Sequence, residues 1–240
     1  MQSSDRGLDE PVNQLLAILP DETYQRLCQH LQPVKLPQQQ ILYNPGDEYE
    51  YAYFPSQAMI SSVVIMKDGS TTEIGVVGKE GMIGLPIILD TSYALNSTVI
   101  VQVSGDGLKI AAKELQKEFR RHEELYNILM RYVQARIIQI SQTAACNRCH
   151  KIEQQFARWL LIVSDSIGKD EFQLTQEFIS QMLGVRRSGV TEIANKFQKA
   201  NIIHYKRGKI KIIDREKLEE YSCECYQLVK TEFNRLIGNF

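Results

Sequence analysis

The sequence predicts an α+β protein with an N-terminal antiparallel β-barrel of the jelly-roll type, a long helix, and a small C-terminal domain of short helices and strands. Three observations support this prediction. Turn-forming residues recur at short intervals between Leu36 and Ile110, and glycine is absent from 108 to 167, where apolar residues follow helical spacing. A net charge of +5 lies between Phe172 and Asp214, although the whole chain carries -1. We therefore expect three parts, residues 1–115, 116–165 and 166–240.

The N-terminal part has the residue pattern of short antiparallel strands. It is rich in Val, Ile, Tyr, Ser and Thr, and turn signals such as Pro45-Gly46-Asp47 interrupt it. Asp68-Gly69 lies between two alternating runs, where glycine supplies the positive φ of a tight hairpin. Such strands are typical of an antiparallel barrel or sandwich. We expect a helical segment from Pro11 to Leu31 to pack on it.

The middle part contains a long amphipathic helix. Its main apolar stripe follows steps of four, four, three and four and consists of Leu129, Val133, Ile137, Ile140 and Ala144. A second apolar set, Ile128, Tyr132 and Ile138, lies off this stripe, so we expect the helix to be covered on two sides. A second copy of the helix would cover the stripe and form a homodimer. Burial of the whole helix within one chain is the alternative.

Two short helices joined by a glycine turn are predicted after the break at SDSIGKD, residues 164–170. Thr175 can cap the first helix, and Gly184 can end it in a left-handed conformation. The second helix would bury Val190, Ile193, Ala194 and Phe197 at positions i, i+3, i+4 and i+7, and leave Ser188, Thr191, Glu192 and Asn195 outward. This arrangement is typical of a helix-turn-helix, whose second helix lies in the major groove of DNA.

A basic hairpin is predicted directly after the second helix. NIIHYKRGKIKIID consists of two short strands around Lys206-Arg207-Gly208, as expected for the wing of a winged helix-turn-helix. A small helical subdomain with an incidental turn is the alternative. Because the charge of +5 between residues 172 and 214 leaves -6 on the rest of the chain, a phosphate-binding module on an acidic body is indicated.

The composition is that of an ordinary globular protein, with 240 residues of which 43% are hydrophobic. No apolar run approaches the roughly 18 residues of a membrane-spanning helix, and the N-terminus lacks the pattern of an export signal. We therefore expect a cytoplasmic protein without membrane contact. Five cysteines, an odd number, are expected to be reduced thiols. No Ser/His/Asp, paired-carboxylate or glycine-rich phosphate pattern stands out, so the sequence does not indicate an enzyme.

The C-terminal segment resembles a known DNA-binding signature. LTQEFISQMLGVRRSGVTEIANKFQKANIIHYKRGKIKIID resembles that of the Crp/Fnr superfamily of bacterial transcription regulators, and PGDEYEYAYFPSQAMISSVVIM is similar to the start of its cyclic-nucleotide-binding-like β-barrel. The resemblance implies a homodimer joined by the long helix, an effector domain, and a two-fold symmetric operator in double-stranded DNA. RNA polymerase and a small-molecule effector are further candidate partners.

The resemblance carries residue roles over only in part. Arg187 matches the arginine that pairs with guanine in the best-known members, where its fork of donors suits O6 and N7. Ser188 and Glu192 stand where those members tend to have a glutamate and an arginine, so a different operator is expected. Arg186 replaces a common capping serine, which leaves its guanidinium free for phosphate. The expected DNA contacts are Thr175, Gln176, Arg186, Arg187, Ser188, Thr191, Glu192, Lys196, Lys206, Arg207 and Lys209.

The effector region departs from the cyclic-nucleotide-binding members. Those members hold the ribose with a glycine-glutamate pair and the cyclic phosphate with an Arg-Ser pair. Here Leu85 stands in place of the glutamate, and Asn96 precedes Ser97 in place of the arginine. A buried phosphate needs a paired positive charge, so cyclic AMP is not expected to bind, and we predict no cofactor.

CNRCH, residues 146–150, formally matches the Cys-x-x-Cys-His pattern of covalent haem attachment. Such haem is attached outside the cytoplasm, and no export signal is present, so haem is not expected. On a helix Cys146, Cys149 and His150 would share one face, which leaves a redox or metal sensor as the alternative function. Structural zinc takes four ligands, however, and this motif supplies three.

The remaining cysteines do not supply an obvious site. Cys223 and Cys225, two apart on a predicted helix, are expected to point away from each other. Only Cys28 lies near the N-terminus, where the iron-sulfur members of the family carry a cysteine cluster. An iron-sulfur cluster is therefore not expected.

Overall fold

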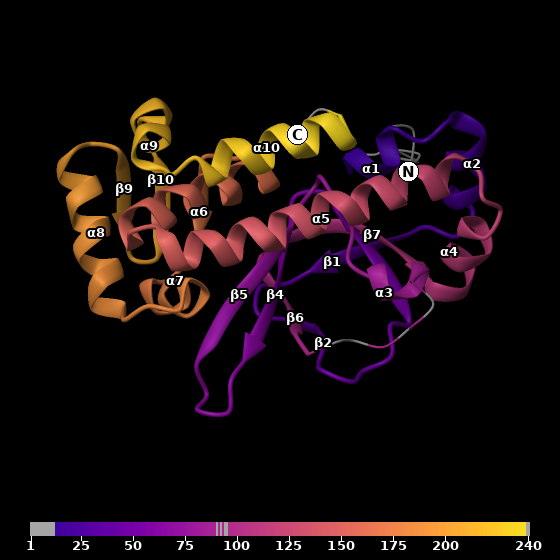
Figure 1. Cartoon of the computed structure of the whole chain (residues 1–240), viewed down its shortest axis with the longest axis horizontal. Coiled ribbons are helices and arrows are strands. Elements are labelled where there is room, and N and C mark those ends of the chain that lie inside the picture. Colours follow the sequence, from indigo (N-terminus) through magenta and orange to yellow (C-terminus); the bar gives the residue numbers. More distant parts are fainter. Residues whose placement is uncertain (1–12, 90, 92, 94–95, 239–240) are drawn as a thin grey trace, which may run out of the picture.

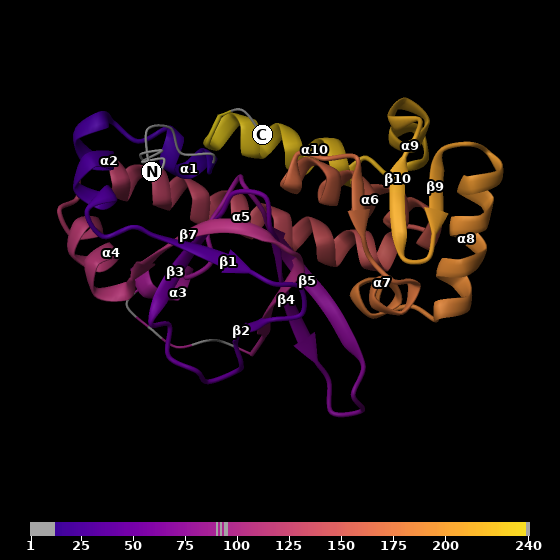
Figure 2. The ribbon, with the colours of Figure 1, turned by 180° about the vertical axis from the view of Figure 1, so that it is seen from behind.

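The structure, a computed structural model, describes residues 13–89, 91, 93 and 96–238. Figure 1 shows a strand-rich part and a helix-rich part side by side, with the long helix α5, Glu124–Cys149, running across the front of both. Figure 2 shows the same molecule from behind, with the strands in front of α5. Within the described ranges, no helix is both long enough and apolar enough to cross a membrane.

Seven strands form two antiparallel sheets around a common core. One sheet has the order β1-β7-β3 and the other β2-β6-β4-β5. Their bounds are β1 Gln32–Leu36, β2 Ile41–Tyr43, β3 Tyr51–Pro55, β4 Met59–Ile65, β5 Thr71–Val77, β6 Thr98–Val103 and β7 Gly105–Ala111. The jelly-roll-like architecture is confirmed, but these two sheets are not closed into a barrel, because their pairing stops at the edge strands. The hairpin at Gly69 joins β4 to β5 as predicted.

Four short helices flank the two sheets: α1 Gln14–Ala17, α2 Asp21–Cys28, α3 Leu85–Ile88 and α4 Ala112–Phe119. The predicted N-terminal helical segment is therefore two helices separated near Pro20, and its residues 11 and 12 lie outside the described part. Asn13 fastens α1 to the strands, because its Oδ1 accepts from the N–H of Leu15 and Leu16 while its Nδ2 donates to the carbonyls of Pro55 and Gly81.

The helix α5 packs one face on the strand-rich part. Tyr132, which is buried, donates from its hydroxyl to the carbonyl of Met82 at 3.0 Å and accepts from the N–H of the same residue at 3.0 Å. Gly81 makes this approach feasible, since a Cβ there would lie 2.3 Å from the tyrosine oxygen. The second apolar set of the sequence, with Ile128 and Tyr132, thus lies against the chain's own core.

The helix-rich part follows α5. It comprises α6 Ile152–Ile167, β8 Glu171–Gln173, α7 Gln176–Leu183, α8 Arg187–Lys199, β9 Ile203–Lys206, β10 Lys209–Ile212, α9 Arg215–Tyr221 and α10 Cys225–Leu236. The three strands pair in the order β8-β10-β9. In Figures 1 and 2, α10 returns along α5 towards α1.

A buried carboxylate links the two parts. Glu73 of β5 accepts from Trp159 Nε1 of α6 at 3.1 Å, from Gln102 Nε2 at 2.6 Å and from Ser61 Oγ at 2.8 Å. Burial raises the pKa of the Glu73 carboxyl above its ordinary value. Around this network, Met59 of β4 belongs to the same hydrophobic cluster as the residues of α6 and α8, so the helix-rich part shares a core with the second sheet.

Candidate nucleic-acid interface

The turn between α7 and α8 has the predicted geometry. Thr175 Oγ1 accepts from the N–H of Phe178 at 3.2 Å, which confirms the N-cap. Gly184 ends α7 with a φ of 64°, a left-handed conformation that glycine adopts without the steric cost of a Cβ. The first turn of α8, after Arg186, has no side-chain cap, as expected from the sequence. The inward face of α8 holds Val190, Ala194 and Phe197.

A recess of about 340 Å³ brings α7, α8 and the hairpin together. It is lined by Thr175, Gln176, Arg187, Tyr205, Arg207 and Gly208. Thr191 of α8 donates from its hydroxyl to Gln176 Oε1 at 2.7 Å, so these two predicted DNA contacts also bond each other. Arg186, Ser188 and Glu192 are exposed nearby on the turn and on α8. Cationic and hydrogen-bonding side chains thus converge on one open surface.

The hairpin of β9 and β10 closes with a two-residue turn. Lys206 pairs with Lys209, while Arg207 and Gly208 between them have φ values of 53° and 79°. This mirror-image turn matches the twist of the strands. It places Lys206, Arg207 and Lys209 at the exposed tip, as expected for a wing.

The sequence-based selection missed one basic position. Lys211 lies with Lys206, Arg207 and Lys209 around a second open groove on the wing. Lys211 is not among the DNA contacts expected from the sequence. The sequence could have indicated Lys211, because residues 209 and 211 are two apart in a strand and therefore share a face.

Three of the expected cations have acidic neighbours. Lys196 forms an ion pair with Glu153 of α6 at 2.6 Å, and Lys209 forms one with Glu171 at 2.5 Å. Arg187 Nη1 lies 3.9 Å from the carboxylate of Glu177. These pairs are partly or largely exposed, so each contributes little to stability.

The outer face of α5 is apolar and, within the described residues, uncovered. Ile137 is 60% exposed, Ile140 39% and Met130 38%, and Figure 1 shows no element over this side of the helix. Together with Val133 and Ala144, these residues follow steps of three, four, three and four, a heptad seam. Leu129, which we expected on this stripe, is only 1% exposed and lies in the chain's own core.

A pocket of about 140 Å³ lies between the second sheet and α5. Leu85 and Ser97 line it, whereas Asn96 is exposed. The sequence missed Arg136, a buried residue of α5 whose guanidinium faces this pocket and donates to the carbonyl of Val76 and to Gln139 Oε1. Arg136 is therefore already occupied by partners within the chain. The pocket is smaller than the roughly 300–1,000 Å³ of common small-molecule sites.

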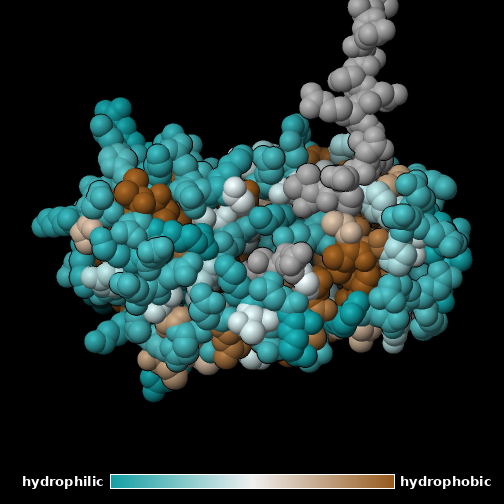
Figure 3. Space-filling model, turned by 90° about the horizontal axis from the view of Figure 1, so that it is seen from above, coloured by the Kyte–Doolittle hydropathy of each residue, from teal (hydrophilic) through white to brown (hydrophobic). Residues whose placement is uncertain are grey.

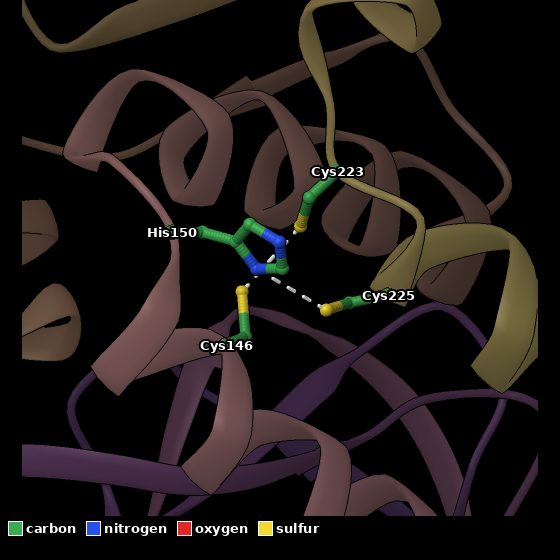
Figure 4. A group of neighbouring side chains, drawn as sticks. All are labelled: Cys146, His150, Cys223 and Cys225. Carbon is green, nitrogen blue, oxygen red and sulfur yellow. Dashed lines mark hydrogen bonds between the residues drawn. The ribbon is translucent and has the colours of Figure 1, made fainter.

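The alternative site of Cys146, Cys149 and His150 does not form, because Cys149 lies outside the cluster that the other two residues join. The helix α5 ends at Cys149, which is exposed, while Cys146 is buried. Cys223 precedes α10 and Cys225 begins it, so the two do not point apart, contrary to the expectation for one continuous helix. Figure 4 shows that both converge on Cys146 and His150. The tertiary structure thus replaces Cys149 by two cysteines from a distant segment.

Comparisons with known proteins agree with this geometry. A family model described as a Crp-like helix-turn-helix domain matches residues 154–221, and one described as a cyclic nucleotide-binding domain matches residues 33–122. Comparison with curated protein sequences gives no match.

Many solved structures share the fold, and three of them serve as examples. A Crp/Fnr-family transcriptional regulator from Eubacterium rectale has 18% identity and a TM-score of 0.65, with 85% of this chain and 94% of that chain covered. FixK2 from Bradyrhizobium japonicum has 12% identity and a TM-score of 0.67, with 80% and 98% covered. A CRP-family transcriptional regulator from Thermus thermophilus has 14% identity and a TM-score of 0.66, with 79% and 96% covered. With both domain models matched in the order of that fold, the chain belongs to the Crp/Fnr superfamily of transcriptional regulators.

Proposed function

We propose that the protein is a homodimeric transcriptional regulator, not an enzyme, and that it binds a two-fold symmetric operator in double-stranded DNA through α8 and the wing. The observation that carries this proposal is the open recess in which Arg187 of α8 lies beside Gln176 and Arg207. An exposed guanidinium among hydrogen-bonding groups at the start of a second helix suits the edge of a guanine in the major groove.

The basic residues divide into two roles in this proposal. Arg187 reads a base edge, because its position in the first turn of α8 directs it into the groove. Lys206, Arg207, Lys209 and Lys211 hold phosphates, because they lie on an exposed hairpin beside the helix. Base contacts supply sequence discrimination, whereas phosphate contacts supply affinity that depends on salt.

The dimer forms through α5 in this proposal. The seam of Met130, Val133, Ile137, Ile140 and Ala144 has the heptad spacing of a two-stranded coiled coil. Two parallel copies of α5 would carry two copies of α8 related by a two-fold axis. Such a pair reads half-sites that are about 34–36 Å apart, one helical turn of DNA.

Cyclic AMP is not the effector in this proposal, because the pocket beside α5 lacks the groups that would hold it. Leu85 cannot hydrogen-bond a ribose, and Asn96 is exposed outside the pocket. The pocket's one cationic lining residue, Arg136, is bonded to Val76 and Gln139. A titration by calorimetry in which cyclic AMP bound with a micromolar or tighter dissociation constant would contradict this proposal.

Operator selection from a random DNA pool tests the DNA-binding proposal. Arg187→Ala should weaken binding to the selected operator by roughly 1–3 kcal/mol more than binding to random DNA. It should also relax the preference at one base pair of each half-site. Lys206→Ala should weaken both DNAs nearly equally and lower the slope of log affinity against log salt by about one per chain. Lys113→Ala, an exposed lysine on α4, is the matched control and should change neither. If Arg187→Ala selected the same consensus operator as the unmutated protein, Arg187 would not read the DNA sequence.

A further inference from the structure

Four side chains of types that can bind a metal ion converge at the junction of α5 and α10. Cys146 comes from α5, His150 follows it, Cys223 lies between α9 and α10, and Cys225 begins α10 (Figure 4). One donor atom of each residue lies within 4.8 Å of all the others. The sequence separates the two pairs by more than seventy residues, so the fold itself assembles this cluster, the Cys3His cluster.

The spacing of the donor atoms fits a single tetrahedral ion. Cys146 Sγ lies 3.5 Å from Cys223 Sγ, and Cys225 Sγ lies 3.5 Å from His150 Nδ1. In a tetrahedral zinc site with Zn–S bonds of about 2.3 Å and Zn–N bonds of about 2.0–2.1 Å, the edges are about 3.8 Å between sulfurs and about 3.6 Å from sulfur to nitrogen. The cluster is therefore within a few tenths of an ångström of zinc geometry along these two edges. An iron-sulfur cluster would need space for its own iron and sulfide atoms between the cysteines.

Neighbouring groups orient the ligands. The Nδ1 atom of His150 faces the sulfurs, and its Nε2 atom lies 3.2 Å from the carboxylate of Glu224. A histidine that binds a metal through one ring nitrogen commonly donates its other N–H to a carboxylate, which fixes the ring and its tautomer. Gln155 Nε2 donates to the carbonyl of His150 at 2.9 Å and to that of Cys146 at 3.3 Å, so it holds the end of α5 in place.

The surroundings also suit the charge of such a site. Zn²⁺ with three thiolates and a neutral imidazole has a net charge of about -1. Arg158 of α6 is buried, and its guanidinium acts as an opposite charge on Cys146. The three sulfurs are buried as well, which protects thiolates from solvent and oxidants.

From this geometry we infer that the Cys3His cluster of Cys146, His150, Cys223 and Cys225 binds one Zn²⁺ per chain. All four positions are filled by protein atoms, as in a structural zinc site, which leaves no open position for catalysis. Binding displaces the thiol protons to solvent and involves no change of oxidation state. The ion would join the end of the long helix to the start of α10.

The first test is the metal content of the full-length, tag-free protein. It is purified under reducing conditions without chelators from cells grown with added zinc, and analysed by inductively coupled plasma mass spectrometry. About one zinc per chain is expected. Co²⁺ added to chelator-stripped protein should give the visible absorption of a tetrahedral thiolate site. Absence of both stoichiometric metal and the Co²⁺ spectrum would overturn the inference, as would iron with sulfide in place of zinc.

Variants assign the ligands. Cys223→Ser should lose the bound zinc, and Glu224→Gln should weaken zinc affinity roughly 10–100-fold. Cys149→Ser is the matched control, because Cys149 is exposed and lies three residues from Cys146 but outside the cluster. It should retain zinc, and loss of zinc in Cys149→Ser would contradict the assigned donor set.

Two further outcomes are decisive. If Cys223→Ser does not fold, metal content and the Co²⁺ spectrum of the unmutated protein still decide whether the site exists. Intact-mass measurement without reductant distinguishes a redox pair from a zinc site. A disulfide between Cys146 and Cys223 in freshly purified protein that lacks zinc would overturn the inference, whereas free thiols that become reactive only after zinc removal would support it.

Discussion

Ile137→Ala should weaken the dimer strongly without unfolding the chain. Ile137 is 60% exposed in the single chain, so this fraction of its surface is available for burial against a second copy of α5. Full burial of an isoleucine contributes roughly 1.5–3 kcal/mol, so the available fraction corresponds to about 1–2 kcal/mol per chain and about 2–4 kcal/mol per two-fold symmetric dimer. The dissociation constant should therefore rise roughly 30–700-fold.

Sedimentation velocity over a range of protein concentrations measures this change. Ile65→Ala is the matched control, because Ile65 is 57% exposed at the end of β4, away from the seam, and its loss should leave the dimer unaffected. Leu129→Ala should act differently, since Leu129 lies in the core. We expect it to lower the free energy of unfolding by about 2–5 kcal/mol. If Ile137→Ala changed the dissociation constant by less than about threefold, the interface would not contain this seam.

Three other predictions concern the fold. Thr175→Ala should lower the free energy of unfolding by about 1 kcal/mol in urea because the cap on the N–H of Phe178 is lost, whereas Thr175→Ser should retain most of it. Gly81→Ala should destabilise more than a surface substitution, because its Cβ would lie 2.3 Å from the Tyr132 oxygen; an unchanged thermal midpoint would contradict the packing described for α5. Burial raises the pKa of Glu73, so folding favours its protonated form, and its contribution to stability should fall as pH rises from about 4 through the raised pKa. Wild type should therefore lose stability relative to Glu73→Gln over this range in urea unfolding, and parallel pH profiles would show that the carboxyl is not perturbed.

Features that depend on a few neighbouring residues could be predicted from the sequence. The hydroxyl of Thr175 and the left-handed turn at Gly184 act within one or two turns of helix, so both were predictable. It is harder to predict which face of α5 is exposed, because Leu129 and Met130 are adjacent and both apolar. Leu129 lies in the chain's own core, and the exposed seam begins at Met130. Residue spacing alone cannot decide which of two adjacent apolar residues begins the exposed stripe.

Features that are formed by segments far apart in the sequence could not be predicted from it. In one continuous helix Cys223 would point away from Cys225, but α10 begins only at Cys225 and Cys223 precedes it. Arg136 reaches the pocket from α5, which no local pattern of the strands reveals. The two sheets also fail to close into a barrel, since closure depends on the pairing of distant edge strands. The domain boundaries and the DNA contacts remain predictions.

The course of α10 restricts how the winged helix-turn-helix can move. Residues 152–224 leave α5 at one end and return beside it through α10, so the helix-turn-helix is inserted in a helical hairpin instead of hanging from one tether (Figure 1). The face seen from above, where α10 lies, is mostly hydrophilic with separate hydrophobic patches (Figure 3). Phe233 and Leu236 of α10 are buried in the core of the strand-rich part, which anchors the second attachment. This second attachment acts together with the core that α6 and α8 share with the second sheet. A domain attached only at the end of α5 could rotate about three axes, whereas two chain attachments and a shared core remove most of that freedom. We therefore expect the two copies of α8 in a dimer to keep a nearly fixed separation, which limits the half-site spacings that the protein can reach.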